Sequence, residues 1–296
     1  MLFLFPYRRS SVYKAAGIAC VYCFILLHIL FAMPFIQSFS INTDKTRPFP
    51  FGIPAVKFAK DISTDGSVIV FVGDNGSGKS SLLESLALYL DLPLIGGYIG
   101  RRHGFEAARA IKPFLQVEWN RQTKTGFFFR AEDFSDFINS IEKEKQKIRG
   151  DLRELEGKVD ERIIQQLLES ERMNGTLNQI RKDYGDDMQQ YSHGEAYLKI
   201  IQTRINGKGI YLLDEPEAAL SPLKQLSLMA FILDVLKAGN AQFIMATHSP
   251  ILMGIPNAAL YEITEDGMNK VDYQDTEHYR ITKTFLDRPE VYLRHL

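Results

Sequence analysis

An eight-residue run from Gly73 to Ser80, GDNGSGKS, fits the pattern G-x-x-x-x-G-K-[ST] and constrains the fold more than any other feature of the chain. It follows five apolar residues, Val68 to Val72, and precedes a segment from Ser81 to Leu90 in which leucine recurs at helical spacing. A buried strand, a glycine-rich turn and a helix form the context in which backbone N–H groups wrap around an anion. The sequence therefore predicts a phosphate cradle within an α/β fold that has a mostly parallel sheet.

The residue types within the cradle indicate its contacts. Glycines let the backbone curl around an anion without Cβ clashes, and the N-terminus of the following helix adds partial positive charge. We expect Lys79 to reach the β- and γ-phosphates of a nucleotide and the Ser80 hydroxyl to bind Mg²⁺. The predicted nucleotide-binding residues are Gly73, Asp74, Asn75, Gly76, Ser77, Gly78, Lys79, Ser80 and Ser81.

A second apolar run, Ile210 to Leu213, ends in two carboxylates, Asp214 and Glu215, followed by a proline. Unbroken apolar runs are typical of parallel strands that are buried on both faces, and ligands in open α/β sheets bind at the carboxyl ends of the strands. We therefore expect Asp214 to hold Mg²⁺, directly or through water. Glu215 is placed to polarise a water for attack on the γ-phosphate. An ordinary strand-to-turn transition is the alternative interpretation.

Two further elements follow the same logic. A third predicted strand, Gln242 to Ala246, is followed by Thr247 and His248, and His248 is predicted to hydrogen-bond the γ-phosphate or the attacking water. The simpler interpretation is that His248 is only a polar residue at a strand end. We favour a role at the γ-phosphate because two other predicted strand ends already carry phosphate-handling residues.

The run Ser192 to Glu195 precedes an apolar helix, Ala196 to Gln202. Serine is a common N-cap residue, so this run gains meaning only from its place upstream of the carboxylate strand.

Together these four elements resemble the ABC-type ATPase superfamily. Within it, the chain is similar to the stand-alone bacterial "AAA family" or predicted ABC-class ATPases, which are related to the structural-maintenance-of-chromosomes and recombination-repair ATPases. The resemblance runs from about Phe49 to the C-terminus. It implies an ABC-type P-loop NTPase fold with a mostly parallel sheet, an antiparallel β portion and an inserted helical lobe.

The resemblance also implies roles for residues of this chain. Ser192, Gly194 and Glu195 would form the signature that contacts the γ-phosphate held by a second subunit, so a homodimer would form on ATP binding. Leu220 to Pro222 resembles the loop that couples the two sites, and His248 resembles the switch histidine. The implied cofactors are ATP and Mg²⁺.

The chain departs from the transporter pattern at several positions. Tyr191 and His193 stand where transporters usually have Leu and Gly, and Glu195 replaces the usual Gln. No glutamine matches the family's Q-loop, and Arg130 or Glu132 stands roughly where it would fall. These departures weaken the expectation of a transporter subunit.

Composition limits the possible partners. The formal net charge of -1 and the isoelectric point of about 6.6 give no overall basic field that would attract nucleic acid. A local basic groove is compatible with this net charge, so the unknown partner could be a protein or a nucleic acid.

The two cysteines, Cys20 and Cys23, exclude disulfide bonds as an organising principle, and no second Cys/His pair near them completes a zinc site.

An apolar run from Ala15 to Ile36 is long enough to cross a hydrocarbon core about 30 Å thick. As a signal anchor it would export the ATPase away from ATP. We therefore favour a cytoplasmic protein without membrane association that starts at Met33, with Pro34 to Ile41 as an alternating first strand. A start at Met1 and a membrane anchor through residues 15–36 form the alternative.

The expected organisation is an apolar N-terminal segment over residues 1–36 and an ABC-type ATPase domain over residues 37–296. A charge-dense stretch at about 133–190 mixes both signs at helical spacing and predicts the helical lobe inserted between the two halves of the nucleotide fold. Near the C-terminus, Asp266-Gly267 predicts a hairpin, and the apolar residues Phe285, Leu286, Tyr292 and Leu293 predict a helical tail docked on the core.

The predicted function is Mg²⁺-dependent hydrolysis of ATP to ADP and phosphate at a composite homodimer site. Glu215, His248 and Lys79 are the predicted catalytic residues, and Phe49 or Phe51 is a candidate for stacking on adenine. Two alternatives remain: a non-hydrolysing switch in which ATP controls docking, and the ATPase subunit of a transporter.

Overall fold

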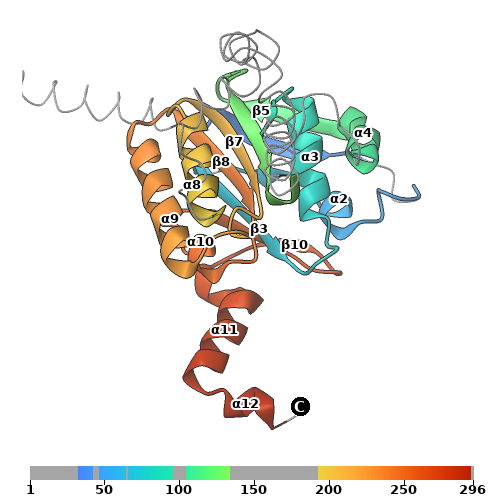
Figure 1. Ribbon diagram of the computed structural model, residues 1–296. Helices are drawn as coiled ribbons and strands as arrows, with labels where there is room; N and C mark the ends of the chain where they lie inside the picture. The colour runs from blue at the N-terminus through green and yellow to red at the C-terminus, as the bar shows by residue number, and fades with distance from the viewer. Residues whose placement is uncertain (1–32, 43–46, 65, 96–104, 134–192, 295–296) are drawn as a thin grey trace, which may run out of the picture.

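The computed structural model describes residues 33–42, 47–64, 66–95, 105–133 and 193–294 (Figure 1). Most of the apolar segment, nearly all of the expected helical lobe, Tyr191 and Ser192 lie outside the described residues. The described residues form two β-sheets with helices between and around them. None of their helices combines the length and the apolar character needed to cross a membrane.

The larger sheet has seven strands in the order β10-β9-β3-β8-β7-β6-β4. Their bounds are β3 Val68–Gly73, β4 Leu94–Ile95, β6 Gly126–Arg130, β7 Gly209–Asp214, β8 Ala241–Ala246, β9 Ala259–Ile263 and β10 Met268–Val271. Neighbours pair in parallel, except for the antiparallel hairpin of β9 and β10. Every residue of β3, β7 and β8 is buried, which confirms the strands predicted from unbroken apolar runs.

A smaller antiparallel sheet has the order β2-β1-β5, with β1 Ile36–Ile41, β2 Ile62–Ser63 and β5 Leu115–Trp119. The first strand predicted over Pro34 to Ile41 is therefore confirmed from Ile36 onward. Gln242 of β8 joins the two sheets: its Oε1 accepts from the Ile36 N–H at 2.9 Å, and its Nε2 donates to the Ile36 carbonyl at 3.1 Å. Both the side chain and the strand end are buried, so these two bonds satisfy groups that water does not reach.

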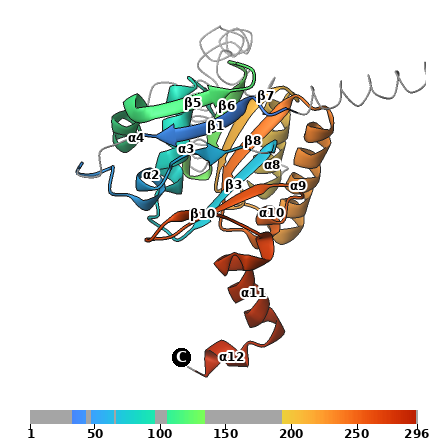
Figure 2. The same cartoon turned by 180° about the vertical axis from the view of Figure 1, so that it is seen from behind.

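Helices cover both faces of the larger sheet (Figures 1 and 2). They are α2 Pro54–Lys57, α3 Lys79–Tyr89, α4 Glu106–Ile111, α8 His193–Arg204, α9 Pro222–Lys237, α10 Pro250–Met253, α11 Glu277–Asp287 and α12 Glu290–Leu293, with 3-10 helices at Lys112–Phe114 and Tyr273–Asp275. Because side chains alternate across a strand, Ile69 and Phe71 of β3 pack in the core around α3 and the smaller sheet. Val70 and Val72 pack in the opposite core, beneath α8 and α9.

The predicted hairpin at Asp266-Gly267 is confirmed, since the Thr264 N–H donates to the Gly267 carbonyl at 2.8 Å between β9 and β10. The predicted tail is helical, but the prediction that it docks on the core is wrong. Helices α11 and α12, here called the C-terminal arm, project away from the sheets and contain no buried residue (Figures 1 and 2). Leu286 is 74% exposed. An amphipathic pattern reveals an apolar face but not what covers that face, and this is why the prediction failed.

Candidate functional site

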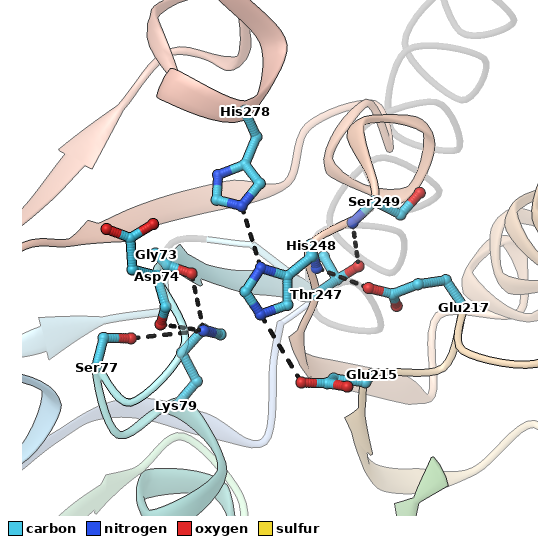
Figure 3. Close-up of polar contacts among 10 residues, drawn as sticks. All are labelled: Gly73, Asp74, Ser77, Lys79, Glu215, Glu217, Thr247, His248, Ser249 and His278. Carbon is cyan, nitrogen blue, oxygen red and sulfur yellow. Dashed lines mark hydrogen bonds and ion pairs between the residues drawn. The ribbon is translucent and has the colours of Figure 1, made fainter. Parts of the chain in front are cut away.

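The candidate site lies at the carboxyl ends of the central strands. Phe71 of β3 and Asp214 of β7 both pair with Ala246 of β8, and Arg130 of β6 pairs with Asp214. The register therefore brings the ends of four strands to one edge of the sheet. The register places Asp214 at this edge, and Figure 3 shows Lys79 of the cradle, Glu215 and His248 beside one another there.

The cradle connects β3 to α3 through residues 74–78. Gly76 and Gly78 have φ values of +82° and +92°, in the left-handed region that side chains rarely adopt. A Cβ at Gly78 would lie 2.1 Å from Cγ2 of Ile53, so the loop packs directly against the segment before α2. The Ala55 N–H donates to the Ser77 carbonyl at 2.9 Å and fixes the loop from behind. Glycine is therefore required at Gly78 for both conformation and space.

Lys79 begins α3 and is buried. Its Nζ donates to the carbonyls of Gly73 at 2.8 Å and Asp74 at 2.9 Å, and lies 3.5 Å from Oγ of Ser77 (Figure 3). Burial lowers the pKa of Lys79, while the charge of Glu215 opposes that shift. The ammonium group thus sits within the loop that is predicted to surround the phosphates.

Asp214 ends β7 and is 3% exposed. Burial raises the pKa of its carboxyl from 3.8 to about 7, while a hydrogen bond from Ser80 opposes that rise. Its Oδ1 is buried, and the described residues give it no hydrogen-bond partner. A buried carboxylate with an unpartnered oxygen beside a hydroxyl is a donor set that suits a hard cation such as Mg²⁺.

Glu215 follows in an unusual backbone conformation, with φ at +49°. Its N–H donates to the Ala246 carbonyl at 2.9 Å, and its own carbonyl accepts from the hydroxyl of the buried Tyr197 of α8 at 3.4 Å. A left-handed non-glycine residue costs about 1 kcal/mol or more, and such residues gather at functional sites. The Glu215 side chain is 46% exposed, so its carboxylate is accessible to water.

His248 faces Glu215, with its Nε2 3.8 Å from Oε1 of that carboxylate (Figure 3). Its backbone N–H donates to Oε1 of Glu217 at 2.6 Å. Its Nδ1 lies 3.1 Å from Nε2 of His278, in α11. Burial lowers the pKa of His248, and the positive charge of Lys79 adds to this effect. The His248 imidazole thus lies between the Glu215 carboxylate, which it faces without a hydrogen bond, and the second imidazole of His278.

Sequence reasoning missed two residues of this site. Glu217 is half-buried; desolvation raises its pKa, and its carboxylate accepts from the backbone N–H of His248. Its proximity to Asp214 and Glu215 in the sequence was a usable signal. His278 lies 30 residues after His248 in the chain. The sequence offers no local spacing that links these two histidines.

Arg130 lies beside the site and forms a charged cluster in which Glu84 is buried and Arg130 and Asp133 are partly buried. Its guanidinium contacts Glu84 of α3 at 2.7 Å and Asp133 at 2.7 Å, and covers the Phe105 ring at 5.0 Å. Burial raises the pKa of Glu84 to about 7, and the charge of Arg130 opposes that rise. Arg130 and Glu132 are the two residues near the expected Q-loop position. Arg130 connects the end of β6 to α3, the helix of the cradle, through its ion pair with Glu84, whereas Glu132 is exposed.

The predicted signature is only partly described. Gly194 and Glu195 lie in the first turn of α8, and Ser192 lies outside the described residues. Glu195 is half exposed and pairs with Lys224 of α9 at 3.0 Å. In a single copy of the chain, the Glu195 side chain therefore contacts α9.

The two candidates for adenine stacking differ in their surroundings. Phe51 packs edge-on against Phe114, with 5.2 Å between the ring centroids, and Arg47 covers the Phe114 ring at 4.2 Å. Phe49 is 76% exposed. Only Phe49 therefore has a largely open ring face.

Comparison with known proteins identifies the family. The ABC transporter family model matches residues 62–218, and a model described as an AAA domain matches residues 195–254. No curated protein sequence matches the chain. Similar solved structures include cbiO1 from Clostridium perfringens, part of the ABC transporter complex cbiONQ, at 13% identity, covering 89% of this chain and 100% of that chain with a TM-score of 0.41. Another is a nucleotide-free ATP-binding cassette from an ABC transporter, at 16% identity, covering 88% and 97% of the two chains with a TM-score of 0.41.

These structural similarities are low, so the assignment rests on the family model. The match spans more than half of the 296 residues and includes the cradle, Arg130, and both carboxylates at the end of β7. The arrangement of those residues at one sheet edge agrees with the match. The chain belongs to the ABC transporter family of ATP-binding domains.

Proposed function

We propose that this chain binds ATP with Mg²⁺ and hydrolyses it to ADP and phosphate. The observation that carries the proposal is the convergence of Lys79, the Asp214-Glu215 pair and His248 at one edge of a parallel sheet. These groups supply a cation for the phosphates, a metal ligand, a proton acceptor and a hydrogen-bond donor. Groups of these kinds recur in enzymes that hydrolyse nucleoside triphosphates.

Each residue has a distinct role in the proposed reaction. Lys79 would exchange the carbonyls of Gly73 and Asp74 for oxygens of the β- and γ-phosphates. Ser80 and Asp214 would hold Mg²⁺, which when bound neutralises phosphate charge. Glu215 would accept a proton from a water that attacks the γ-phosphorus, and the bond from that phosphorus to the bridging oxygen of ADP would break.

We further infer that the active form is a homodimer in which Ser192, Gly194 and Glu195 of one subunit complete the site of the other. Support comes from the position of Gly194 and Glu195 in the first turn of α8, where backbone N–H groups are available to an anion. The short match to an AAA domain, beginning at Glu195, supports kinship with stand-alone ATPases.

We also infer a single ATPase domain over residues 37–296, with residues of about 133–190 inserted into it. Strand β6 ends at Arg130 and α8 begins at His193, yet β6 and β7 pair side by side in the same sheet. The segments on either side of the insertion therefore share one core.

The function is tested with Glu215→Gln and Lys79→Ala, assayed for phosphate release and for ATP binding. Glu215→Gln should bind ATP like wild type, lose at least about a hundredfold in turnover and accumulate as a dimer with ATP. Lys79→Ala should lose nucleotide binding. Normal turnover by Glu215→Gln would reject its role as the base, and unchanged ATP affinity of Lys79→Ala would reject the cradle.

The matched family favours a second candidate, the ATPase subunit of a transporter. Such a subunit would dock on a membrane partner that controls its turnover. Purification from membranes with a permease would support this candidate, whereas full ATPase activity without a membrane partner would count against it. Nucleotide binding without phosphate release would instead indicate the docking switch.

A further inference from the structure

The side chain of His278 links the C-terminal arm to the candidate nucleotide site. His278, the second residue of α11, places its Nε2 3.1 Å from Nδ1 of His248, and the two ring centroids are 5.3 Å apart (Figure 3). The rest of the arm projects away from the sheets. This contact is therefore a link between the arm and the strand ends that carry the site.

The base of the arm is held firmly, so the contact is built into the fold. The hydroxyl of Thr276, which is fully buried, donates to the Tyr273 carbonyl at 2.8 Å and accepts from the Tyr279 N–H at 3.4 Å. The Tyr273 hydroxyl donates to the Pro250 carbonyl at 2.8 Å, at the start of α10. The Glu277 N–H donates to the Glu262 carboxylate of β9 at 2.8 Å. Two elements that flank the site thus fix the first turn of α11.

The direction of the hydrogen bond between the two histidines follows from the other side of the His248 ring. Nε2 of His248 is buried, has no hydrogen-bond partner among the described residues, and faces the Glu215 carboxylate, which can only accept. A proton is therefore favoured on Nε2. Burial lowers the pKa of His248, and a neutral imidazole carries one N–H, so Nδ1 is left as an acceptor. His278 must then donate from its Nε2.

We propose that His278 is a positioning residue: by donating to Nδ1 of His248, it selects the tautomer whose Nε2–H points at the γ-phosphate of ATP. The inference rests on the proposed function, because only a protein that binds ATP has a γ-phosphate for this Nε2–H to contact. Without the donor, His248 is free to rotate or to carry its proton on Nδ1. It would then present a lone pair, rather than a hydrogen, to a phosphate oxygen.

The same bond couples the arm to the nucleotide. Any movement of α11 that withdraws His278 weakens the hold of His248 on the γ-phosphate. Binding free energies are reciprocal, so ATP must in turn favour the arm position in which His278 reaches His248.

The test compares three variants of the full chain by steady-state phosphate release. His278→Leu removes the donor and should lower kcat about tenfold with a much smaller change in KM, as expected for one lost hydrogen bond in the transition state. His278→Gln keeps an N–H donor near the same position and should stay within about threefold of wild type. Arg280→Leu, an exposed change on the same helix, is the control and should stay within about twofold. Full activity of His278→Leu, or an equal loss in His278→Gln, would overturn the proposal.

A second measurement does not depend on catalysis. The ¹⁵N shifts of the imidazole nitrogens report which nitrogen carries the proton, and loss of a signal in His248→Gln assigns His248. Near pH 8 and without nucleotide, His248 should have a protonated Nε2 and a bare Nδ1. A proton on Nδ1 of His248 would refute the role of His278. If wild type releases no phosphate, the proposed function fails, and the spectrum alone decides the direction of the bond.

Discussion

Asp214 is expected to destabilise the nucleotide-free protein. The residue is 3% exposed, and burial raises the pKa of its carboxyl from 3.8 to about 7. Because the folded state binds this proton more tightly than the unfolded chain does, the folded protein loses stability as pH rises from about 4 to about 7. Asp214→Asn keeps the shape and can still accept from Ser80, but cannot ionise. The variant should therefore be more stable than wild type at pH 8.

The size of the effect follows from the shift. One pKa unit corresponds to about 1.4 kcal/mol, so a rise of about three units corresponds to about 4 kcal/mol over the full range. Between pH 5 and pH 8, wild type titrates through about two of those units. The stability advantage of Asp214→Asn should accordingly grow by about 3 kcal/mol over that interval.

The assay is urea unfolding of both proteins at pH 5 and pH 8 without nucleotide or divalent cations. Asp234→Asn is the matched control, because Asp234 is a highly exposed carboxylate paired with Lys237 on α9. Its effect should stay within about 0.5 kcal/mol at both pH values. An advantage of Asp214→Asn that is the same at pH 5 and pH 8 would refute the argument that burial of this carboxylate governs the pH dependence.

Three further predictions concern packing. Arg130→Met leaves Glu84 buried without its partner and should destabilise the protein by about 3–5 kcal/mol in urea unfolding; adding Glu84→Gln should recover most of that loss, and no recovery would contradict the pairing. Gln242→Leu leaves the buried Ile36 N–H of β1 without its partner, while the Ile36 carbonyl still accepts from the Thr64 hydroxyl, and should cost about 2 kcal/mol; a cost below about 1 kcal/mol would show that the sheets are joined elsewhere. Gly78→Ala brings a Cβ within 2.1 Å of a neighbouring side chain and should lower ATP affinity at least about tenfold in equilibrium dialysis; Gly52→Ala, with no atom within 4 Å of its Cβ, is the control, and equal affinities would reject the steric argument.

The central strands could be predicted because burial on both faces leaves a strong trace in the sequence. Strands β3 and β7 read as apolar runs, β8 does so after Gln242, and all residues of the three strands are buried. Strand β5, Leu115–Trp119, alternates apolar with polar residues, which is typical of a half-buried strand, but a run of five residues is short and it was not predicted. The C-terminal arm was correctly predicted to be helical, but the prediction that it docks on the core was wrong. The helical spacing of its apolar residues does not indicate which element, if any, covers them.

The site could be predicted where its residues belong to local patterns. Lys79 and Ser80 lie within one loop motif, and Asp214 and Glu215 lie at one strand end, so spacing alone indicated their chemistry. Glu217 and His278 act through tertiary contacts with His248. Contacts of this kind depend on how α11 leaves the hairpin, which no short sequence pattern specifies.

The support behind the cradle has a consequence for affinity. Ile53 and Ala55 hold the loop through packing and a hydrogen bond, and Lys79 ties it to the Gly73 carbonyl. Ordering a backbone residue costs about 1–2 kcal/mol, and here that entropy is lost when the chain folds rather than when a ligand arrives. The loop is thus preorganised, so substitutions at Ile53 would weaken nucleotide affinity by freeing the loop, although an alkyl side chain offers no polar group to a phosphate.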